Sequence, residues 1–382
     1  MKMFDVYPLQ QVTPVKGKGS ILWDEQGQKY LDLYGAHAVI SIGHSDPRYI
    51  KAISGQVADL GFYSNSVLNP LQPELAQRLG QVSGYNEYNL FLCNSGAEAV
   101  EQAIKLASFH TNRKKVVSIK KGFHGRTSLA VSVTDSPSLS APVNQVHDVV
   151  FAEMNDLSTI ERFLSGHDVA VVIIEGIQGI AGIYEPEAEF LLGLESLCAA
   201  HNSLLLIDEI QSGYGRTGKF FAHQHVGVTP NLITVAKGMG NGFPIGGVLI
   251  HPEIKASFGL LGTTFGGTHM ACAAALAVLQ VIEEDHLMAN ATLVGNYLKA
   301  ELQELPGVEV RGRGLMIGLE FSFGVRELRK KLLSEFHIFT GVSNNPNVLR
   351  ILPPLCLTVE EAHYFVNSLK KVLTNETVFV SK

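Results

Sequence analysis

The feature that most constrains the fold is a pattern that repeats from about residue 90: a short apolar run, a glycine-containing turn, and a segment of helical length. Runs of this length that are rich in β-branched residues are typical of buried strands. Strands that alternate with helices favour a mostly parallel central sheet with helices on both faces, an α/β fold. We predict strands at Val116–Ile119, Val169–Ile174, Leu204–Ile207, Leu232–Ala236 and Gly247–Ile250, and helices at Asp156–Leu164 and Ala188–Ala200.

The two ends of the chain carry different patterns. Residues 13–34 contain short β-favouring runs joined by a turn at Asp24-Glu-Gln-Gly27, which predicts a hairpin. After about residue 280, long helical patterns flank short strands, and this predicts a smaller α+β domain. We therefore expect three parts: residues 1–45, an N-terminal segment that packs with the small domain; residues 46–280, the large ligand-binding domain; and residues 281–382, the small domain.

Composition narrows the class of protein. Hydrophobic residues make up 46% of the 382 residues and charged residues 17%, which is enough apolar material for a large core. The net charge of −6 comes without blocks of like charge, so we expect no nucleic-acid partner. Neither a signal peptide nor a stretch apolar enough to span a membrane is found. The four cysteines lack metal-site spacing, and we expect reduced thiols, no metal and a cytoplasmic location.

Lys237 stands where the apolar run of residues 232–236 breaks into glycines. No Asp or Glu occurs between residues 210 and 252, so nothing nearby in the sequence pairs with its ammonium group. Burial without a local acid should lower the pKa of the lysine, and such an amine is a nucleophile suited to forming a Schiff base with a carbonyl. The alternative is a lysine that reaches from a strand end to water.

Polar groups follow other predicted strands, at the edge where ligands bind in open α/β sheets. Asp208 comes directly after four apolar residues and needs a partner, which a ligand cation or a protein group would supply. Ser95 and Glu98 have the spacing of a capping box, so the start of their helix is either an ordinary cap or a phosphate site. In Gly122-Phe-His-Gly-Arg-Thr127 the aromatic ring could stack on a flat ligand and Arg126 could hold a carboxylate.

Two further patterns do not define sites. Gly213-Tyr-Gly-Arg-Thr-Gly218 matches the glycine fingerprint of dinucleotide-binding proteins, but no helical pattern follows and the next acid is Glu253. His223 and His225 could chelate a metal, but no third ligand with suitable spacing accompanies them. We therefore expect neither a nicotinamide cofactor nor a metal.

Together, Asn94-Ser-Gly-Ala-Glu-Ala, Phe123-His-Gly-Arg-Thr, Asp208-Glu-Ile-Gln-Ser-Gly and Lys237-Gly resemble the class III, fold-type-I aminotransferases, which use pyridoxal 5′-phosphate (PLP). The resemblance runs nearly end to end and is strongest to the acetylornithine and succinylornithine aminotransferases. It implies a transaminase of arginine metabolism that moves an amino group between glutamate or 2-oxoglutarate and the δ-position of an N-acylornithine. Within the same class, ornithine, 4-aminobutyrate or glutamate semialdehyde remain alternative substrates, the last for an aminomutase; a non-catalytic scaffold is the alternative from another class.

The resemblance also implies residue roles. Lys237 would form the Schiff base with PLP and Asp208 would hold the ring nitrogen protonated. The remaining cofactor contacts would come from Ser95, Gly96 and Ala97 at the phosphate, Phe123 on the ring, Gln211 at the phenolic oxygen, and Thr264 from the neighbouring subunit. Substrate contacts would come from Arg126, Thr263 and Arg350. These roles imply a homodimer with shared active sites.

The chain departs from the family pattern at Glu175-Gly-Ile-Gln-Gly-Ile-Ala-Gly182, where the family commonly has Glu-Pro-x-Gln-Gly-Glu-Gly-Gly. Ile180 therefore replaces the glutamate that the resemblance places against Arg350. An isoleucine cannot neutralise an arginine, so we expect Arg350 to be left open or to find another acid.

Overall fold

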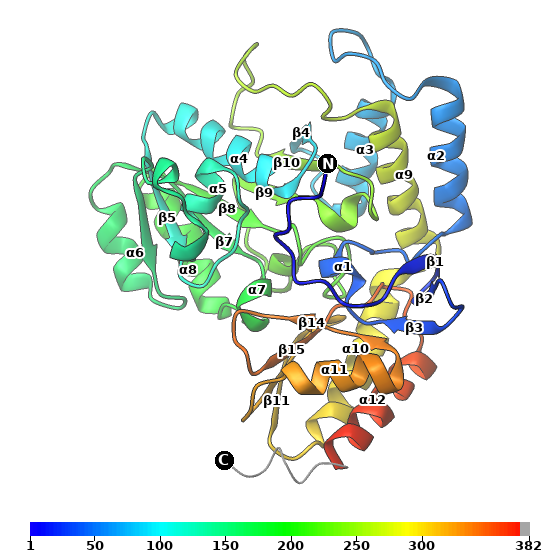
Figure 1. The fold of residues 1–382 in the computed structure, drawn as a ribbon. Helices are drawn as coiled ribbons and strands as arrows, with labels where there is room; N and C mark the ends of the chain where they lie inside the picture. Colours follow the sequence, from blue (N-terminus) through cyan, green and yellow to red (C-terminus); the bar gives the residue numbers. More distant parts are fainter. Residues whose placement is uncertain (375–382) are drawn as a thin grey trace.

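The computed structural model describes residues 1–374, which are built around a seven-stranded sheet (Figure 1). Its strands are β4 (Asn89–Cys93), β5 (Lys115–Ile119), β6 (Val149–Ala152), β7 (Val169–Glu175), β8 (Leu204–Asp208), β9 (Leu232–Val235) and β10 (Gly246–Ile250). They lie in the order β4-β10-β9-β8-β7-β5-β6. Only β10 runs antiparallel to its neighbours in this sheet. The predicted α/β fold with a mostly parallel sheet is confirmed.

The alternation of side chains along each strand gives the sheet two apolar faces. In β7, Val171 and Ile173 pack with α4 (Gly96–Thr111), while Val172 and Ile174 pack on the opposite face. That opposite face is covered by α6 (Leu157–Leu164) and α8 (Ala188–Ala200). Because both faces are covered, the strands read as unbroken apolar runs in the sequence.

Three helices stand side by side at the β4 edge of the sheet (Figure 1). They are α2 (Pro47–Leu60), α3 (Leu71–Ser83) and α9 (His269–Glu284). Ile50, Ile53 and Val57 have helical spacing, which predicts a helix after Pro47, and α2 begins there with Asp46 as its cap. Helix α9 was not predicted; ten of its sixteen residues are buried, so it lacks a clear polar face.

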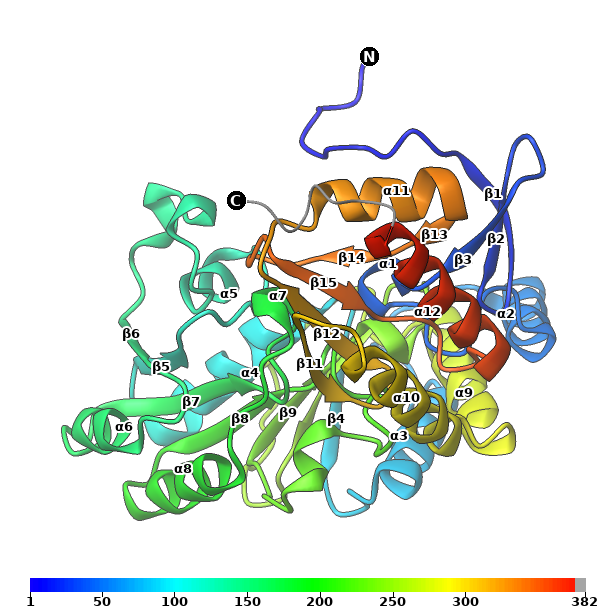
Figure 2. The same ribbon diagram turned by 90° about the horizontal axis from the view of Figure 1, so that it is seen from below.

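The C-terminal part is organised around a second sheet, in the order β11-β12-β15-β14 (Figure 2). Its strands are β11 (Val308–Arg313), β12 (Met316–Phe321), β14 (Gly341–Val342) and β15 (Val348–Ile351). The helices of this part are α10 (Leu287–Gln303), α11 (Arg326–Phe336) and α12 (Val359–Thr374). The sequence patterns predict these helices at Ala291–Leu305, Val325–Phe336 and Thr358–Leu373, within a few residues of the observed bounds. None of the helices in residues 1–374 is long and apolar enough to cross a membrane.

The N-terminal hairpin joins a third sheet that includes a strand from the C-terminal part. This sheet runs β1-β2-β3-β13, with β1 (Pro14–Lys18), β2 (Ile21–Asp24), β3 (Lys29–Asp32) and β13 (Ile338–Phe339). Leu31 of β3 pairs with Ile338 of β13, so segments more than 300 residues apart are neighbours. The short remaining helices are α1 (Gly35–Ala38), α5 (Ser128–Ser132), α7 (Gly179–Gly182), and the 3-10 turns η1 (Pro137–Leu139), η2 (Pro142–Asn144), η3 (Ala222–His225) and η4 (Lys237–Met239).

The glycine pattern at Gly213–Gly218 and the histidine His223, which matched nucleotide-binding and metal-binding patterns in the sequence, have structural roles. The segment Gly213–Gly218 lies in consecutive turns, and the buried Arg216 within it donates to the carbonyls of Leu315 and Pro353. His223 is fully buried, with Nδ1 2.7 Å from Glu209 and Nε2 2.6 Å from the Tyr85 hydroxyl. In the described part of the chain, no cluster of three or more His, Cys, Asp or Glu residues could hold a metal.

Removing Glu209 should destabilise the fold strongly. Burial raises the pKa of Glu209, but the hydrogen bonds from His223 and Ser212 more than offset this, so its pKa lies below the ordinary value. Glu209→Ala removes the acceptor of the His223 ring, the His223 N–H and the Ser212 hydroxyl. Because each buried donor left unsatisfied costs about 1–3 kcal/mol, we expect a loss of about 3–5 kcal/mol in the free energy of unfolding at neutral pH. A lowered carboxyl pKa contributes stability above the unfolded-state pKa, so the loss should shrink as the pH falls below about 4.

Denaturant unfolding of Glu209→Ala and Glu185→Ala tests this prediction. Glu185 forms an ion pair with Arg313 at the surface, where such pairs contribute about 0–1 kcal/mol. Equal losses in the two variants would contradict the buried role of Glu209.

Candidate active site

Most of the predicted site residues meet at the carboxyl edge of the central sheet. Glu175 and Asp208 are register partners at the ends of neighbouring strands β7 and β8, and Lys237 follows β9 after one residue. A cavity of about 300 Å³ opens at this edge, large enough for a small cofactor. The predicted residues that line it are Ser95, Gly96, Ala97, Phe123, Asp208, Gln211 and Lys237.

Lys237 has the electrostatic surroundings expected of a nucleophilic amine. The pKa of its ammonium group is lowered to about 8, mainly by burial and to a smaller extent by the nearby cation Arg350, against the opposing effect of Asp208 and Glu175. Within residues 1–374 its Nζ has no hydrogen-bond or ion-pair partner. Lys237 also has a φ of +46°, an uncommon backbone conformation for a residue other than glycine. The predicted loss of proton affinity is confirmed.

The loop that carries Lys237 is braced by the segment between α1 and α2. Ser41 Oγ donates to the Gly238 carbonyl over 2.7 Å, and the Tyr49 hydroxyl donates to the Gly240 carbonyl over 2.6 Å. The buried Asn241 amide accepts from the Ser41 and Ile42 N–H groups. These bonds fix the strained backbone of the lysine from the opposite side of the loop.

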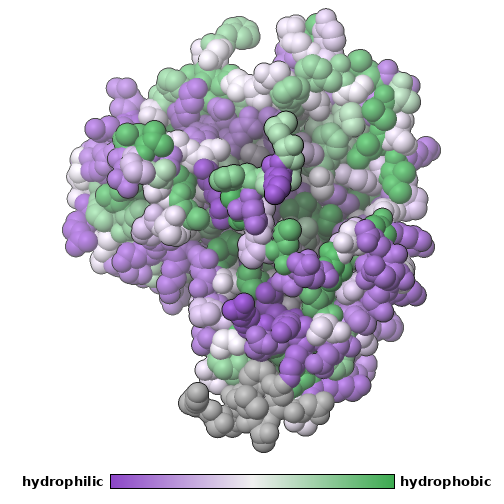
Figure 3. All heavy atoms as spheres, viewed as in Figure 1, coloured by the Kyte–Doolittle hydropathy of each residue, from purple (hydrophilic) through white to green (hydrophobic). Residues whose placement is uncertain are grey.

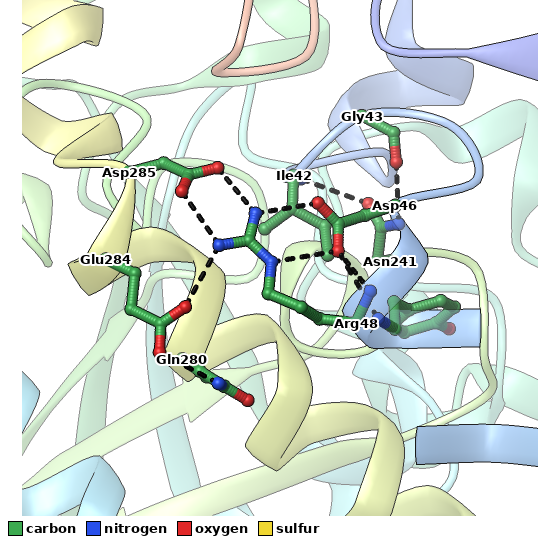
Figure 4. Close-up of polar contacts among 9 residues, drawn as sticks. Ile42, Gly43, Asp46, Arg48, Asn241, Gln280, Glu284 and Asp285 are labelled. Carbon is green, nitrogen blue, oxygen red and sulfur yellow. Dashed lines mark hydrogen bonds and ion pairs between the residues drawn. The ribbon is translucent and has the colours of Figure 1, made fainter. Parts of the chain in front are cut away.

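The same segment is tied to the end of α9 through Arg48. Figure 4 shows its guanidinium between Asp46 on one side and Glu284 and Asp285 on the other. Asn241 lies beside this cluster and also donates to the Gly43 carbonyl over 3.0 Å. The arginine thereby connects the brace of the lysine loop to the junction between α9 and α10.

The carboxylate of Asp208 is held by His124, a residue that the sequence motifs did not single out. Its Oδ2 lies 2.7 Å from Nδ1 of His124, and its Oδ1 accepts from the Ile210 N–H over 3.0 Å. His124 is buried, and in the described part of the chain its Nε2 has no partner. The sequence predicted that Asp208 needs a cation or a protein group as partner, and the structure supplies the imidazole. No local sequence pattern predicts this contact, because 84 residues separate His124 from Asp208.

We expect His124→Ala to weaken catalysis without preventing cofactor binding. A hydrogen bond to a charged group contributes about 1.5–3 kcal/mol, which corresponds to roughly a 10- to 100-fold fall in kcat. The pH dependence of the cofactor's absorption reports whether the electrostatics around Asp208 have changed. His124→Asn offers one donor to the carboxylate and should recover part of the loss. An unchanged absorption profile in His124→Ala would contradict this positioning role.

The start of α4 forms one end of the cavity. Ser95 caps the helix, accepting the Glu98 N–H over 3.2 Å, while the Glu98 carboxylate reaches back to the Asn94 N–H. The first N–H groups of a helix have no partner within the helix and are suited to an anion. Two close approaches keep this end compact: a Cβ on Gly96 would lie 2.9 Å from Ile210, and one on Gly125 would lie 2.7 Å from Ala97.

Glu175 is a second residue that the sequence reasoning missed. Its oxygens accept the N–H groups of Phe123 and Gly179, each over 2.9 Å, so it connects two loops at the cavity. Burial raises the pKa of its carboxyl group. The rule that singled out Asp208, a carboxylate directly after a buried strand, applies equally to Glu175 at the end of β7.

Arg350 is fully buried behind the cavity wall. Its Nε donates to the Val342 carbonyl over 2.5 Å, and its Nη1 donates to Gln211 Oε1 over 3.2 Å. Gln211 in turn donates through Nε2 to the His37 carbonyl over 3.0 Å. Of the two expectations for Arg350, finding another acid is wrong: its side-chain partner among the described residues is an amide.

Besides Arg350, three predicted residues lie outside the cavity in this single chain. Arg126 and Thr264 are exposed. Thr263 lines a separate surface cavity, although its Oγ1 accepts from Asn94 Nδ2 over 3.0 Å and Asn94 lines the main cavity. In the space-filling view, polar and apolar residues are mixed over the face of the molecule that Figure 1 shows (Figure 3). The contacts predicted for Arg126, Thr263 and Thr264 stay predictions.

Comparison with known proteins identifies the class. The family model for class-III aminotransferases matches residues 6–373, and the chain belongs to this family. It is similar to an acetylornithine aminotransferase of Archaeoglobus fulgidus, 39% identical over 94% of this chain and 95% of the relative. Among solved structures it resembles an acetylornithine aminotransferase from Elizabethkingia anophelis, with a TM-score of 0.84 and 30% identity over 97% of this chain and 96% of the other.

A second solved structure bears on the cofactor. The chain is similar to an ornithine aminotransferase from Toxoplasma gondii, with a TM-score of 0.88 and 29% identity over 95% of this chain and 90% of the other. That structure has partial occupancy of PLP at its active site. Class-III aminotransferases are PLP-dependent transaminases, so the family and cofactor implied by the motifs are confirmed.

The donor set of the cavity fits PLP. An amine of lowered pKa suits the aldehyde, the start of α4 suits the phosphate, and a buried carboxylate suits the ring nitrogen. PLP carries in one molecule the three parts that these groups suit: a carbonyl, an anion and a basic nitrogen.

Proposed function

We propose that this protein is a cytoplasmic aminotransferase that moves an amino group between glutamate or 2-oxoglutarate and the δ-position of N-acetylornithine or N-succinylornithine. The observation that carries the proposal is the meeting of Lys237, Asp208 and the start of α4 in one cavity. The relatives named acetylornithine aminotransferase, which match 94–99% of the chain, support the substrate class.

Each residue of the cavity has a separate role in the proposed reaction. PLP, when bound, supplies an electron sink for the carbanion formed at the reacting carbon. Lys237 Nζ would hold the aldehyde carbon and, once free, would move the proton at the reacting carbon. Asp208 would keep the ring nitrogen protonated. Phe123 would contact the ring, and Gln211 would donate to the phenolic oxygen. Ser95, Gly96 and Ala97 at the start of α4 would hold the phosphate.

Substrate binding requires charges outside the cofactor pocket. Arg126 holds the α-carboxylate of the acylornithine and the distal carboxylate of glutamate, and Arg350 holds the α-carboxylate of glutamate. In the homodimer that we propose, Thr264 reaches the phosphate bound by the neighbouring subunit, with Thr263 close to the substrate. The exposure of Thr264 in the single chain supports this assignment. We also propose that residues 1–45, 46–280 and 281–382 are the N-terminal segment, the large domain and the small domain.

Ornithine is the second candidate, because ornithine aminotransferases are among the similar solved structures. The free α-ammonium of ornithine distinguishes it from an acylornithine. Rapid mixing of the purified enzyme with glutamate, N-acetylornithine, N-succinylornithine, ornithine and 4-aminobutyrate, each alone, separates the candidates through the cofactor's absorption. We expect glutamate and one N-acylornithine to react at least about tenfold faster than ornithine. A fastest reaction with ornithine or 4-aminobutyrate would replace the proposed substrate.

A further inference from the structure

Arg350 is a buried cation that no acid among residues 1–374 contacts. Its Nε and Nη1 donate to the Val342 carbonyl and the Gln211 amide, both neutral groups. Its Nη2 is buried and, in the described part of the chain, has no hydrogen-bond partner. A buried guanidinium ordinarily has a carboxylate or a full set of acceptors, because leaving a buried charge uncompensated is costly. This arginine therefore lacks an anion.

The nearby acid Glu175 does not contact the arginine. It acts on Arg350 only through the field of its charge, and its two oxygens accept the N–H groups of Phe123 and Gly179 instead. Gly179 also fixes the neutral partner, because a Cβ there would lie 1.7 Å from Gln211 Oε1. The glycine thus leaves space for the amide that touches the arginine.

Ile180 occupies the wall next to this arrangement. It lines the cavity, and its carbonyl accepts from the Asn344 N–H over 2.8 Å. Asn344 is two residues beyond Val342, whose carbonyl binds Arg350, so the isoleucine and the arginine are tied to the same short segment. At this position the cavity wall carries a hydrocarbon side chain that can neither accept a hydrogen bond nor offset a positive charge.

We propose that Ile180 is a specificity-determining residue which, by offering no carboxylate, leaves the buried Arg350 without an acid partner, so that a carboxylate of the substrate can pair with it. The inference rests on the proposed function. A substrate with a carboxylate on the reacting carbon, such as glutamate, supplies the missing anion. A substrate whose reacting carbon carries no carboxylate, such as the δ-carbon of an acylornithine, reacts beside a cation that has no counter-ion. The open arginine therefore favours the glutamate half-reaction over the acylornithine half-reaction.

The matched pair Ile180→Glu and Ile180→Gln isolates the charge, since the two side chains have nearly the same size. The two half-reactions are measured separately in the PLP-loaded dimer by rapid mixing. Helix α7, which carries Ile180, packs against β15, which carries Arg350, so a new carboxylate there should compete for the arginine. We expect Ile180→Glu to lower the rate with glutamate, relative to that with N-acylornithine, about 10- to 100-fold. Ile180→Gln should change both rates by similar factors. If Ile180→Glu changed the rates of both half-reactions by the same factor, the inference would be overturned.

Binding provides a readout that does not depend on turnover. Glutarate has two carboxylates and no amine, and its dissociation constant is measured by calorimetry. We expect Ile180→Glu to weaken glutarate binding about tenfold or more relative to Ile180→Gln. Ile180→Asp and Ile180→Asn serve as a second pair if the longer side chains prevent folding. Equal affinities within both pairs would contradict the inference, whereas a wild-type enzyme inert to glutamate and to every N-acylornithine would contradict the proposed function instead.

Discussion

Lys237→Ala should lower the rate of transamination by about 10⁴-fold or more. The change removes both the amine that binds the cofactor and the group that moves the proton at the reacting carbon, and residues that act in the chemical step cost this much when lost. The lowered pKa of about 8 leaves a useful fraction of the wild-type amine unprotonated near neutral pH. The rate is measured with glutamate in single-turnover experiments, so that product release does not mask the chemistry.

Lys219→Ala is the matched control. Lys219 is an exposed lysine whose Nζ donates to the Gln224 carbonyl, away from the cavity. We expect its loss to change the rate less than about twofold, because isolated surface substitutions have small effects. Should Lys237→Ala keep more than about one hundredth of the wild-type rate, the catalytic role of this lysine would have to be abandoned.

Asp208→Asn should have the second-largest effect, a fall in kcat of about 10²- to 10³-fold at nearly unchanged volume. The amide cannot hold the ring nitrogen protonated, so the cofactor loses much of its power to stabilise negative charge. The substitution also removes the carboxylate that lies 2.7 Å from His124. PLP should remain bound, since the lysine and the start of α4 are untouched, and absorption spectroscopy verifies this before the rate is measured.

A double-mutant cycle separates the two contributions of Asp208. If His124 acts through the carboxylate, adding His124→Ala to Asp208→Asn should cost much less than His124→Ala costs alone. Additive effects of the two substitutions would mean that His124 acts independently of Asp208.

The sequence predicted the central sheet well because the physical signal there is local. Strands such as β7 and β8 are buried on both faces, so their apolar runs and the carboxylates that end them are visible without any tertiary information. The lowered pKa of Lys237 could be anticipated from the same kind of pattern. Helix α9 was not predicted because most of its residues are buried, which weakens the alternation of apolar and polar residues on which helix prediction depends.

The missed contacts are those that join distant segments. His124 meets Asp208, and Gln211 meets Arg350, across separations of 84 and 139 residues that no local pattern encodes. The sequence did show that Arg350 lacked its expected acid, but not that an amide took its place. Arg126 and Thr264 are exposed and do not line the cavity in the single chain, so their predicted roles stay predictions.

Borohydride reduction followed by peptide mass analysis tests the central claim most directly. The purified protein should be yellow, and reduction should remove the colour and fix one PLP per chain to the peptide that contains Lys237. The account predicts that this label is absent from Lys237→Ala and present in Lys219→Ala. A colourless protein that takes up no added PLP, or a label on any other lysine, would contradict it.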